Sequence, residues 1–130
     1  MVRPKPALAV KADTPIGECV RLMKEHNVGS VLVISDDEKG DLVGIFTERD
    51  LLKMIKIVDE GRHLDKPVRT VMTKKVKTID YTRIHEALDI MVENGFRHLP
   101  VVSTGNDGKV RVAGVISMRD LLKQAKKPSA

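Results

Sequence analysis

The spacing of hydrophobic residues predicts two amphipathic helices at similar places in the two halves of the chain. In each half, four apolar residues recur three or four positions apart or stand side by side, which places them along one side of a helix. They are Ile16, Cys19, Val20 and Met23 in the first half, and Ile84, Ala87, Leu88 and Met91 in the second. The same element is therefore predicted twice.

Short apolar runs on either side of these helices predict strands. Polar turns rich in Asp, Asn and Gly join the two runs that follow each helix, as expected for hairpins. The runs cover residues 8–10, 30–34 and 42–46 in the first half, and 76–79, 98–102 and 110–116 in the second. A second helix then begins at Thr47 and at Ser117. The predicted order is β-α-β-β-α, written twice.

A repeated segment supports this division into halves. "GIFTERDLLK" (44–53) and "GVISMRDLLK" (114–123) share six of ten positions. The helices upstream align at an offset of 68 and this segment at 70, so two extra residues are expected in one loop of the second copy. We assign a first repeat to 6–60, a linker to 61–75 and a second repeat to 76–126.

Each half has about 60 residues, which is marginal for independent stability. We therefore expect an α/β (α+β) fold in which two pseudo-symmetric repeats pack sheet to sheet in one globule. The chain has 42% apolar residues, no Trp, one Tyr and two Phe, so the core is expected to be aliphatic. No apolar run approaches the roughly 20 residues of a membrane span. The start of the chain lacks the apolar stretch of a secretory signal, and Cys19 is alone, so we expect a cytoplasmic protein without disulfides.

The charge is compatible with an anionic partner. The formal net charge is +5, which suits a nucleotide, a nucleic acid or a phosphate, but also describes a solvated surface with more Lys than Glu. High charge with only four Asn and Gln residues is a weak sign of a thermophilic protein.

The repeated segment contains a hydroxyl residue followed three positions later by Asp, at Thr47/Asp50 and Ser117/Asp120. One interpretation is a helix N-cap, which contributes about 1 kcal/mol and needs no ligand. The other is a nucleotide cradle, because a helix N-terminus suits phosphate and a carboxylate accepts hydrogen bonds from ribose hydroxyls. A glycine three residues before each hydroxyl leaves room for another group to approach.

These features together resemble the CBS domain family. The resemblance rests on the two β-α-β-β-α halves, on "GIFTERD" and "GVISMRD", on "GFRHLPVV" and on the linker "PVRTVMT". The chain resembles a stand-alone CBS pair, or Bateman module, over about residues 6–125. The resemblance implies a regulatory module without catalytic activity, metal or cofactor. It implies that AMP, ADP, ATP or S-adenosylmethionine binds in clefts between the halves.

The family's binding positions carry over to two candidate sites. In the family, the Asp holds the ribose hydroxyls and the neighbouring hydroxyl contacts phosphate or ribose. The first site would combine Ile45, Thr47, Asp50, Thr73, Val76, Lys77 and Thr78 with Phe96, Arg97 and His98. The second would combine Val115, Ser117, Arg119 and Asp120 with Val10, Val28 and Gly29.

The resemblance favours the first of these sites. Adenine would lie among Ile45, Val76 and Phe96, and Arg97 would supply charge for phosphate. Gly29 matches Arg97 and Pro4 matches Thr73, so the second site is expected to lack a charge and a hydroxyl. His98 and Arg119 remain open between a phosphate contact and an ordinary structural or solvated role.

Three alternatives remain beside an AMP, ADP or ATP sensor. One is an S-adenosylmethionine sensor, and the others are a protein or nucleic-acid interaction module with vestigial clefts. The scarcity of aromatic residues argues against nucleic acid. The family implies a homodimer, and the helices after Thr47 and Ser117 carry surplus apolar residues. These are Leu51, Leu52 and Ile55, and Leu121, Leu122 and Ala125.

Overall fold

The computed structural model describes residues 3–57 and 62–125, which form two compact units. The first-repeat unit is Leu8–Val76, and the second-repeat unit joins Met1–Ala7 to Lys77–Ala130. The contacts thus group residues 62–75 of the predicted linker with the first repeat. They group the N-terminal segment with the second repeat, although it is distant in sequence.

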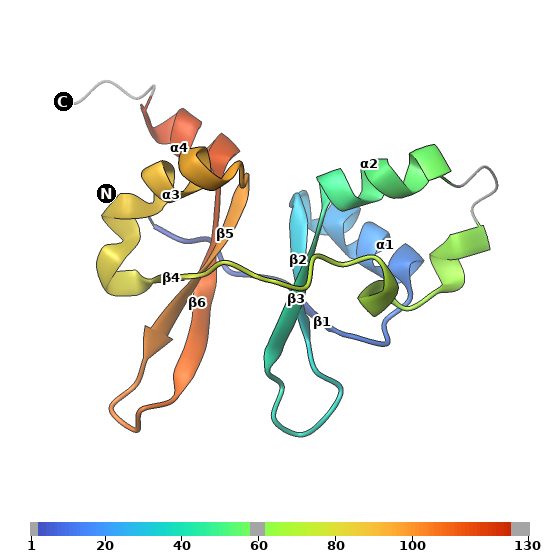
Figure 1. Ribbon diagram of the computed structural model, residues 1–130, viewed down its shortest axis with the longest axis horizontal. Helices are drawn as coiled ribbons and strands as arrows, with labels where there is room; N and C mark the ends of the chain where they lie inside the picture. The colour runs from blue at the N-terminus through green and yellow to red at the C-terminus, as the bar shows by residue number, and fades with distance from the viewer. Residues whose placement is uncertain (1–2, 58–61, 126–130) are drawn as a thin grey trace. The chain divides into compact units, whose positions relative to one another are not determined.

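The first-repeat unit contains a three-stranded sheet and two helices (Figure 1). Strand β1 is parallel to β2, and β2 is antiparallel to β3. The elements are β1 (Ala9–Lys11), α1 (Ile16–His26), β2 (Ser30–Ile34), β3 (Leu42–Thr47) and α2 (Glu48–Ile57). Two 3-10 turns follow, η1 (Arg62–Asp65) and η2 (Val68–Thr70).

The second-repeat unit has the same order of strands and the same directions, with β4 parallel to β5 and β5 antiparallel to β6. Its elements are β4 (Ile79–Asp80), η3 (Tyr81–Glu86), α3 (Ala87–Asn94), β5 (His98–Thr104), β6 (Val110–Ser117) and α4 (Met118–Ala125). The predicted mixed α and β fold with two β-α-β-β-α repeats is confirmed. The packing of one sheet on the other stays a prediction.

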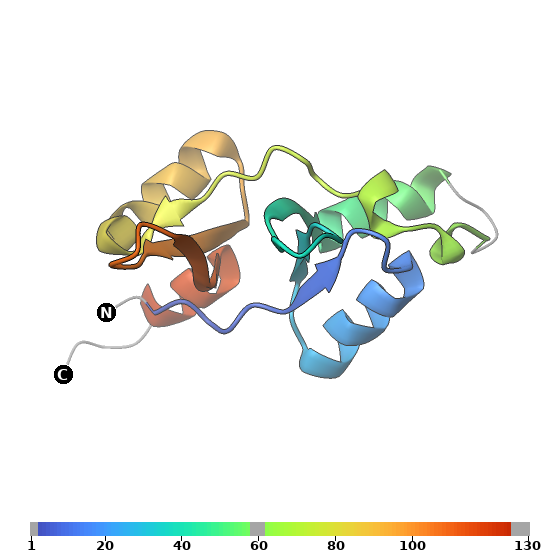
Figure 2. The same cartoon turned by 90° about the horizontal axis from the view of Figure 1, so that it is seen from below.

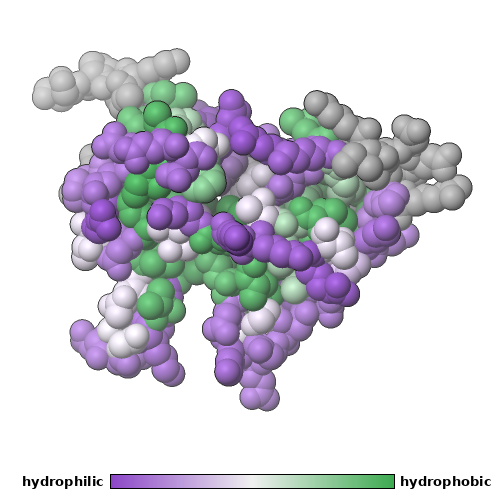
Figure 3. Space-filling view, in the orientation of Figure 1, coloured by the Kyte–Doolittle hydropathy of each residue, from purple (hydrophilic) through white to green (hydrophobic). Residues whose placement is uncertain are grey.

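The two hairpins match in register up to a bulge and differ beyond it. Ser30 pairs with Thr47 as His98 pairs with Ser117, and both ladders shift register after the pairing of Val33 or Val101 with a glycine. Over their whole lengths, β5 and β6 have 7 and 8 residues, against 5 and 6 in β2 and β3, and the additional pairs of β5 and β6 lie beyond the bulge. The two extra residues therefore lengthen a hairpin and not a loop, which corrects the prediction. The β2–β3 turn is exposed and hydrophilic (Figure 3).

Each unit has a core cluster of its own, and both clusters are mainly aliphatic, as predicted. Phe46 is fully buried in the first cluster, together with Ile16, Cys19 and Met23 from the predicted stripe of α1. In the second cluster, Ala87 and Met91 are buried, but Leu88 is 46% exposed. The placement of Leu88 in the stripe was wrong: Ile84 lies in the 3-10 turn η3 and α3 begins only at Ala87, so Ile84 and Leu88 do not share one continuous α-helix.

Two predicted boundaries also change. The strand predicted at 76–79 is only Ile79–Asp80. The helix predicted around residues 84–91 begins later, as α3, and the 3-10 turn η3 precedes it. In η3 the Asp80 carboxylate accepts a hydrogen bond from the Thr82 N–H (2.9 Å), and Arg83 has non-helical backbone angles. Within the predicted linker, Pro67 has an extended conformation and is the N-cap of the 3-10 turn η2. In the described part of the chain, no helix is long and apolar enough to cross a bilayer.

Candidate functional site

Asp50 is held at the start of α2 by reciprocal hydrogen bonds with Thr47. The Thr47 N–H donates to Asp50 Oδ2 (3.0 Å), and the Asp50 N–H donates to Thr47 Oγ1 (3.3 Å). The Thr47 hydroxyl also lies 3.2 Å from Asp50 Oδ2. This is a capping box, so the N-cap interpretation is confirmed, and one carboxylate oxygen of Asp50 is committed to it.

Asp120 has the same role in the second unit. Its N–H donates to Ser117 Oγ (3.1 Å), and the Ser117 hydroxyl donates to Asp120 Oδ2 (2.7 Å). In both units the cap uses Oδ2, which leaves Oδ1 of each aspartate for other partners. A cap and a ligand contact therefore do not exclude each other at these residues.

In the first unit, the segment after η2 crosses β3 and brings a hydroxyl to Asp50. Thr73 pairs with Ile45 through two backbone hydrogen bonds of 2.9 and 3.0 Å. Its side-chain hydroxyl donates to Asp50 Oδ1 (3.2 Å). The predicted association of Ile45, Thr47, Asp50 and Thr73 is thus present inside one unit, and we call these four residues the first half-site.

In the second unit, the N-terminal segment occupies the equivalent place against β6 (Figure 2). Lys5 pairs with Val115 through two backbone hydrogen bonds of 2.9 Å. Its ammonium group lies 3.0 Å from Asp120 Oδ1. The counterpart of Thr73 is therefore Lys5 and not Pro4, which corrects the sequence alignment. We call Lys5, Val115, Ser117 and Asp120 the second half-site.

The glycines of the repeated segment allow these crossings. A Cβ atom on Gly44 would lie 3.0 Å from the Thr73 carbonyl oxygen, and one on Gly114 would lie 2.5 Å from the Lys5 carbonyl oxygen. The predicted close approach is confirmed at both glycines. At Gly114 the backbone of Lys5 approaches most closely, whereas at Gly44 the Met72 side chain approaches more closely than the Thr73 backbone does.

The two aspartates differ in their electrostatic environment. Burial of Asp120 raises its pKa, but the hydrogen bond from Ser117 and the contact with Lys5 together lower that pKa below its usual value. Asp120 is 21% exposed and carries a neutralising lysine, whereas the partner of Asp50 Oδ1 is a neutral hydroxyl. The second half-site thus has a positive charge that sequence reasoning missed.

Arg97 and His98 lie beside the second half-site. The Met118 N–H donates to the Arg97 carbonyl (2.7 Å), just as the Glu48 N–H donates to the Gly29 carbonyl (3.1 Å). This equivalence confirms that Gly29 matches Arg97. Since Arg97, His98 and Phe96 belong to the unit that does not contain Asp50, their predicted grouping with Asp50 stays a prediction.

The remaining predicted residues are spread over both units. Val10 is 7% exposed in the core of the first unit, and Ile45 of the first half-site is 6% exposed, so a ligand contact of either side chain stays a prediction. Val28 packs against the same core. Arg119 and Lys77 are exposed, and Val76 and Thr78 are half-buried in a stretch without helix or strand.

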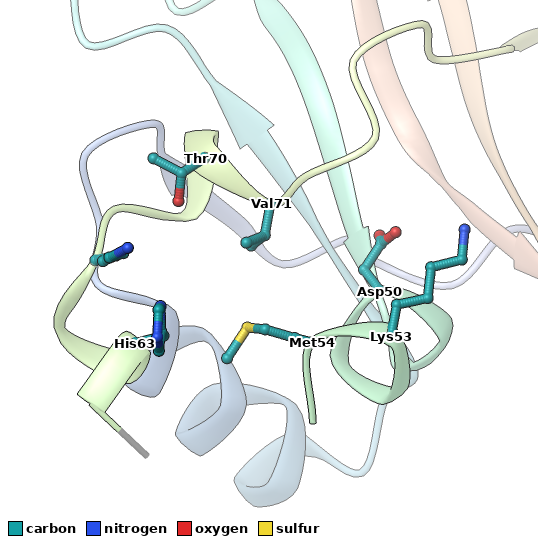
Figure 4. A pocket seen from close by; sticks show the side chains of 7 residues that line it. Asp50, Lys53, Met54, His63, Thr70 and Val71 are labelled. Carbon is teal, nitrogen blue, oxygen red and sulfur yellow. The ribbon is translucent and has the colours of Figure 1, made fainter. Parts of the chain in front are cut away.

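A pocket of about 360 Å³ adjoins Asp50 inside the first unit (Figure 4). Asp50, Lys53 and Met54 line it from one side of α2, at the spacing i, i+3, i+4 that shares a helix face. The other lining residues come from the segment between α2 and Thr73; they are His63, Lys66, Thr70 and Val71. Sequence reasoning missed this pocket, and only the spacing within α2 would have suggested it.

Two kinds of chemistry find no support among the described residues. Residues 3–57 and 62–125 contain no group of three or more His, Cys, Asp or Glu side chains that could hold a metal ion. Cys19 is buried, and burial raises the pKa of its thiol to about 11, so it is protonated at neutral pH and is a poor nucleophile.

Comparison with known proteins identifies relatives over most of the chain. A 17.7 kDa protein from the bps2 3′ region of Acidianus ambivalens is 43% identical over 113 residues, which are 86% of this chain and 63% of that protein. MK0525 of Methanopyrus kandleri is 37% identical over 77% of this chain and 48% of that protein. The chain thus spans less than two thirds of the length of these two curated relatives.

Solved structures of CBS-domain proteins are also similar to this chain over most of its length. The CBS-domain containing protein ATU1752 from Agrobacterium tumefaciens superposes with a TM-score of 0.75 at 34% identity, covering 93% of this chain and 85% of that one. CBSX2 in complex with AMP has a TM-score of 0.66 at 27% identity, covering 92% and 87%. The CBS domain pair of MJ0100, in complex with 5′-methylthioadenosine and S-adenosyl-L-methionine, has a TM-score of 0.72 at 25% identity, covering 93% and 92%.

The profile of the CBS domain matches the chain twice, at residues 2–57 and 68–127. Each match contains one of the two caps with its aspartate, at Asp50 and at Asp120. Together with the repeated topology and the solved relatives, these matches show that the chain belongs to the CBS domain family and carries a pair of CBS domains.

Proposed function

We propose that this CBS pair is a non-catalytic regulatory module that binds an adenosine nucleotide, with AMP as the first candidate and ADP or ATP as the others. The observation that supports the proposal most directly is the arrangement at Asp50. Its Oδ2 is used by the cap, while Oδ1 accepts a hydrogen bond from the neutral Thr73 hydroxyl, at 3.2 Å. A carboxylate oxygen in this position accepts hydrogen bonds from the vicinal hydroxyls of a ribose.

The environment of Asp50 also suits the rest of a nucleotide. The N-terminus of α2 favours negative charge, and Lys53 stands one turn after Asp50 at the edge of the adjoining pocket. The relatives solved with AMP and with S-adenosyl-L-methionine support an adenosyl ligand. S-adenosylmethionine is accordingly the second candidate, favoured by the MJ0100 pair.

Ligand-dependent stabilisation tests the proposal. At a concentration 100 times its dissociation constant, a ligand that binds only the folded protein adds about 2.7 kcal/mol to the free energy of unfolding. We expect AMP to raise the melting temperature, and adenosine to have a smaller effect because it lacks the phosphate. Melting curves with AMP, ADP, ATP and S-adenosylmethionine measure this, with GMP as the control for the base. If none of these compounds raises the melting temperature, the proposed function is wrong.

We also propose that the module is a homodimer formed through its helices. Leu52 on α2 and Leu122 on α4 are 61% and 54% exposed, more than a solvated helix surface requires. Leu121 is buried and Leu51 is half-buried, so these two belong to the cores. The side chains of Ile55 and Ala125 lie outside those that the structure describes. We expect the double variant Leu52→Glu and Leu122→Glu to sediment as a monomer at micromolar concentrations at which the parent is a dimer. A monomeric parent protein would contradict the proposal.

The cytoplasmic location and the thermophilic origin remain predictions. So does the alternative of a protein or nucleic-acid interaction module. Salt-dependent binding to nucleic acid, measured beside the melting curves, separates that alternative from the nucleotide sensor.

A further inference from the structure

The two half-sites are built alike, and among the four residues that define each of them the difference in charge lies at the crossing residue. Thr73 and Lys5 make the same pair of backbone hydrogen bonds, to Ile45 and to Val115. Each crosses its strand beside a glycine, and each places its side chain against Oδ1 of the aspartate. A different side chain at the crossing residue, Thr73 or Lys5, can therefore change which ligand the half-site prefers.

The difference is one of charge. Thr73 donates a neutral hydroxyl to Asp50, whereas Lys5 brings an ammonium group to Asp120 at 3.0 Å. Lys53 and Lys123 stand three residues after the two aspartates in both units, so they do not create the asymmetry. With the aspartate and its crossing residue counted together, the first half-site is negative and the second is neutral.

The difference in charge between the half-sites affects the phosphate groups, which are the part in which AMP, ADP and ATP differ. AMP and ATP share the base and the ribose, but ATP carries two more phosphate groups and is repelled more strongly by an uncompensated carboxylate. The Lys5 side chain is 61% exposed, so its ammonium group keeps donors available for a phosphate while it neutralises Asp120. Lys5 should therefore increase the affinity for ADP and ATP more than it increases the affinity for AMP.

We propose that Lys5 makes the second half-site selective for adenosine di- and triphosphates, whereas the Thr73 half-site selects AMP or a less anionic adenosyl compound. The inference rests on the proposed function and extends it. It assigns different ligand classes to the two half-sites of one chain, and it makes the N-terminal segment part of the binding machinery of the second repeat.

Calorimetric titration of AMP and ATP in an Asp50→Ala background, where the second half-site remains intact, tests the role of Lys5. Replacing Lys5 with Met keeps the length of the side chain and removes its charge, and the ratio of ATP affinity to AMP affinity should fall about tenfold. Lys5→Arg should keep the ratio. Lys109→Met, at an exposed lysine in the β5–β6 turn of the same unit, is the control for net charge and should also keep it.

The reciprocal substitution tests the same idea without altering Lys5. In an Asp120→Ala background, Thr73→Lys should raise the ratio of ATP to AMP affinity at the first half-site about tenfold. If both ratios stay unchanged in proteins that still bind AMP, Lys5 is only a structural contact and the inference is overturned. If the parent protein binds none of the adenosyl compounds, the proposed function is overturned, and this inference with it.

Discussion

Asp50→Ala is expected to weaken AMP binding by about 30- to 150-fold, and by more than Asp120→Ala does. The loss corresponds to roughly 2 to 3 kcal/mol, the contribution of a charge-assisted pair of hydrogen bonds to ribose hydroxyls. Asp50 should carry more of the AMP affinity because its Oδ1 meets a hydroxyl, whereas Oδ1 of Asp120 is already paired with Lys5. Calorimetric titration of AMP into both variants measures the difference.

The cap at Asp50 requires a control, because removing the carboxylate also removes an acceptor for the Thr47 N–H. Loss of the cap lowers the free energy of unfolding by about 1 kcal/mol without changing affinity. Asp50→Asn keeps an amide oxygen for the cap and removes the charge. Its melting temperature should therefore be close to that of the parent, while its affinity for AMP should be lower than that of the parent. If Asp50→Ala melts lower but binds AMP as the parent does, the repeated segment is only scaffolding.

Features within one repeat could be predicted from sequence because they depend on residues close together in the chain. The stripe of Ile16, Cys19 and Met23 follows from helix periodicity, and the caps at Thr47 and Ser117 follow from a spacing of three residues. These are local rules, and they hold in both copies.

The half-sites could be predicted only in part, because their crossing residues come from distant segments. Thr73 and Lys5 pair with Ile45 and Val115, 28 and 110 positions away in sequence. The two repeats align at offsets of 68 and 70. An offset of 68 matches Thr73 to Lys5, and an offset one residue larger matches it to Pro4. The backbone pairing resolves this choice. Sequence also could not show that His63 and Lys66 line a pocket beside Asp50.

The strand that carries the first half-site depends on one buried aromatic residue. Phe46 is fully buried in the core of the first unit, between Ile45 and Thr47, whose side chains point to the opposite face of β3. Phe46→Ala is expected to lower the free energy of unfolding by about 3 to 5 kcal/mol, because it removes buried apolar surface and leaves a cavity. Phe46→Leu should cost less than about 1.5 kcal/mol, because it keeps most of the volume. Denaturant titration measures both values.

Phe46→Ala should lose stability but keep its affinity for AMP, whereas Asp50→Ala should lose affinity but keep most of its stability. Because the Phe46 side chain packs in the core, on the other face of β3 from the side chains of Ile45 and Thr47, the folded fraction of Phe46→Ala should bind AMP within about threefold of the parent, a change below about 0.7 kcal/mol. Asp50→Ala should lose most of its affinity and little of its stability. Calorimetry well below the melting temperature of each variant compares them. If Phe46→Ala remains folded but loses AMP binding as completely as Asp50→Ala, affinity depends on the packing of β3 and not on the aspartate that follows it.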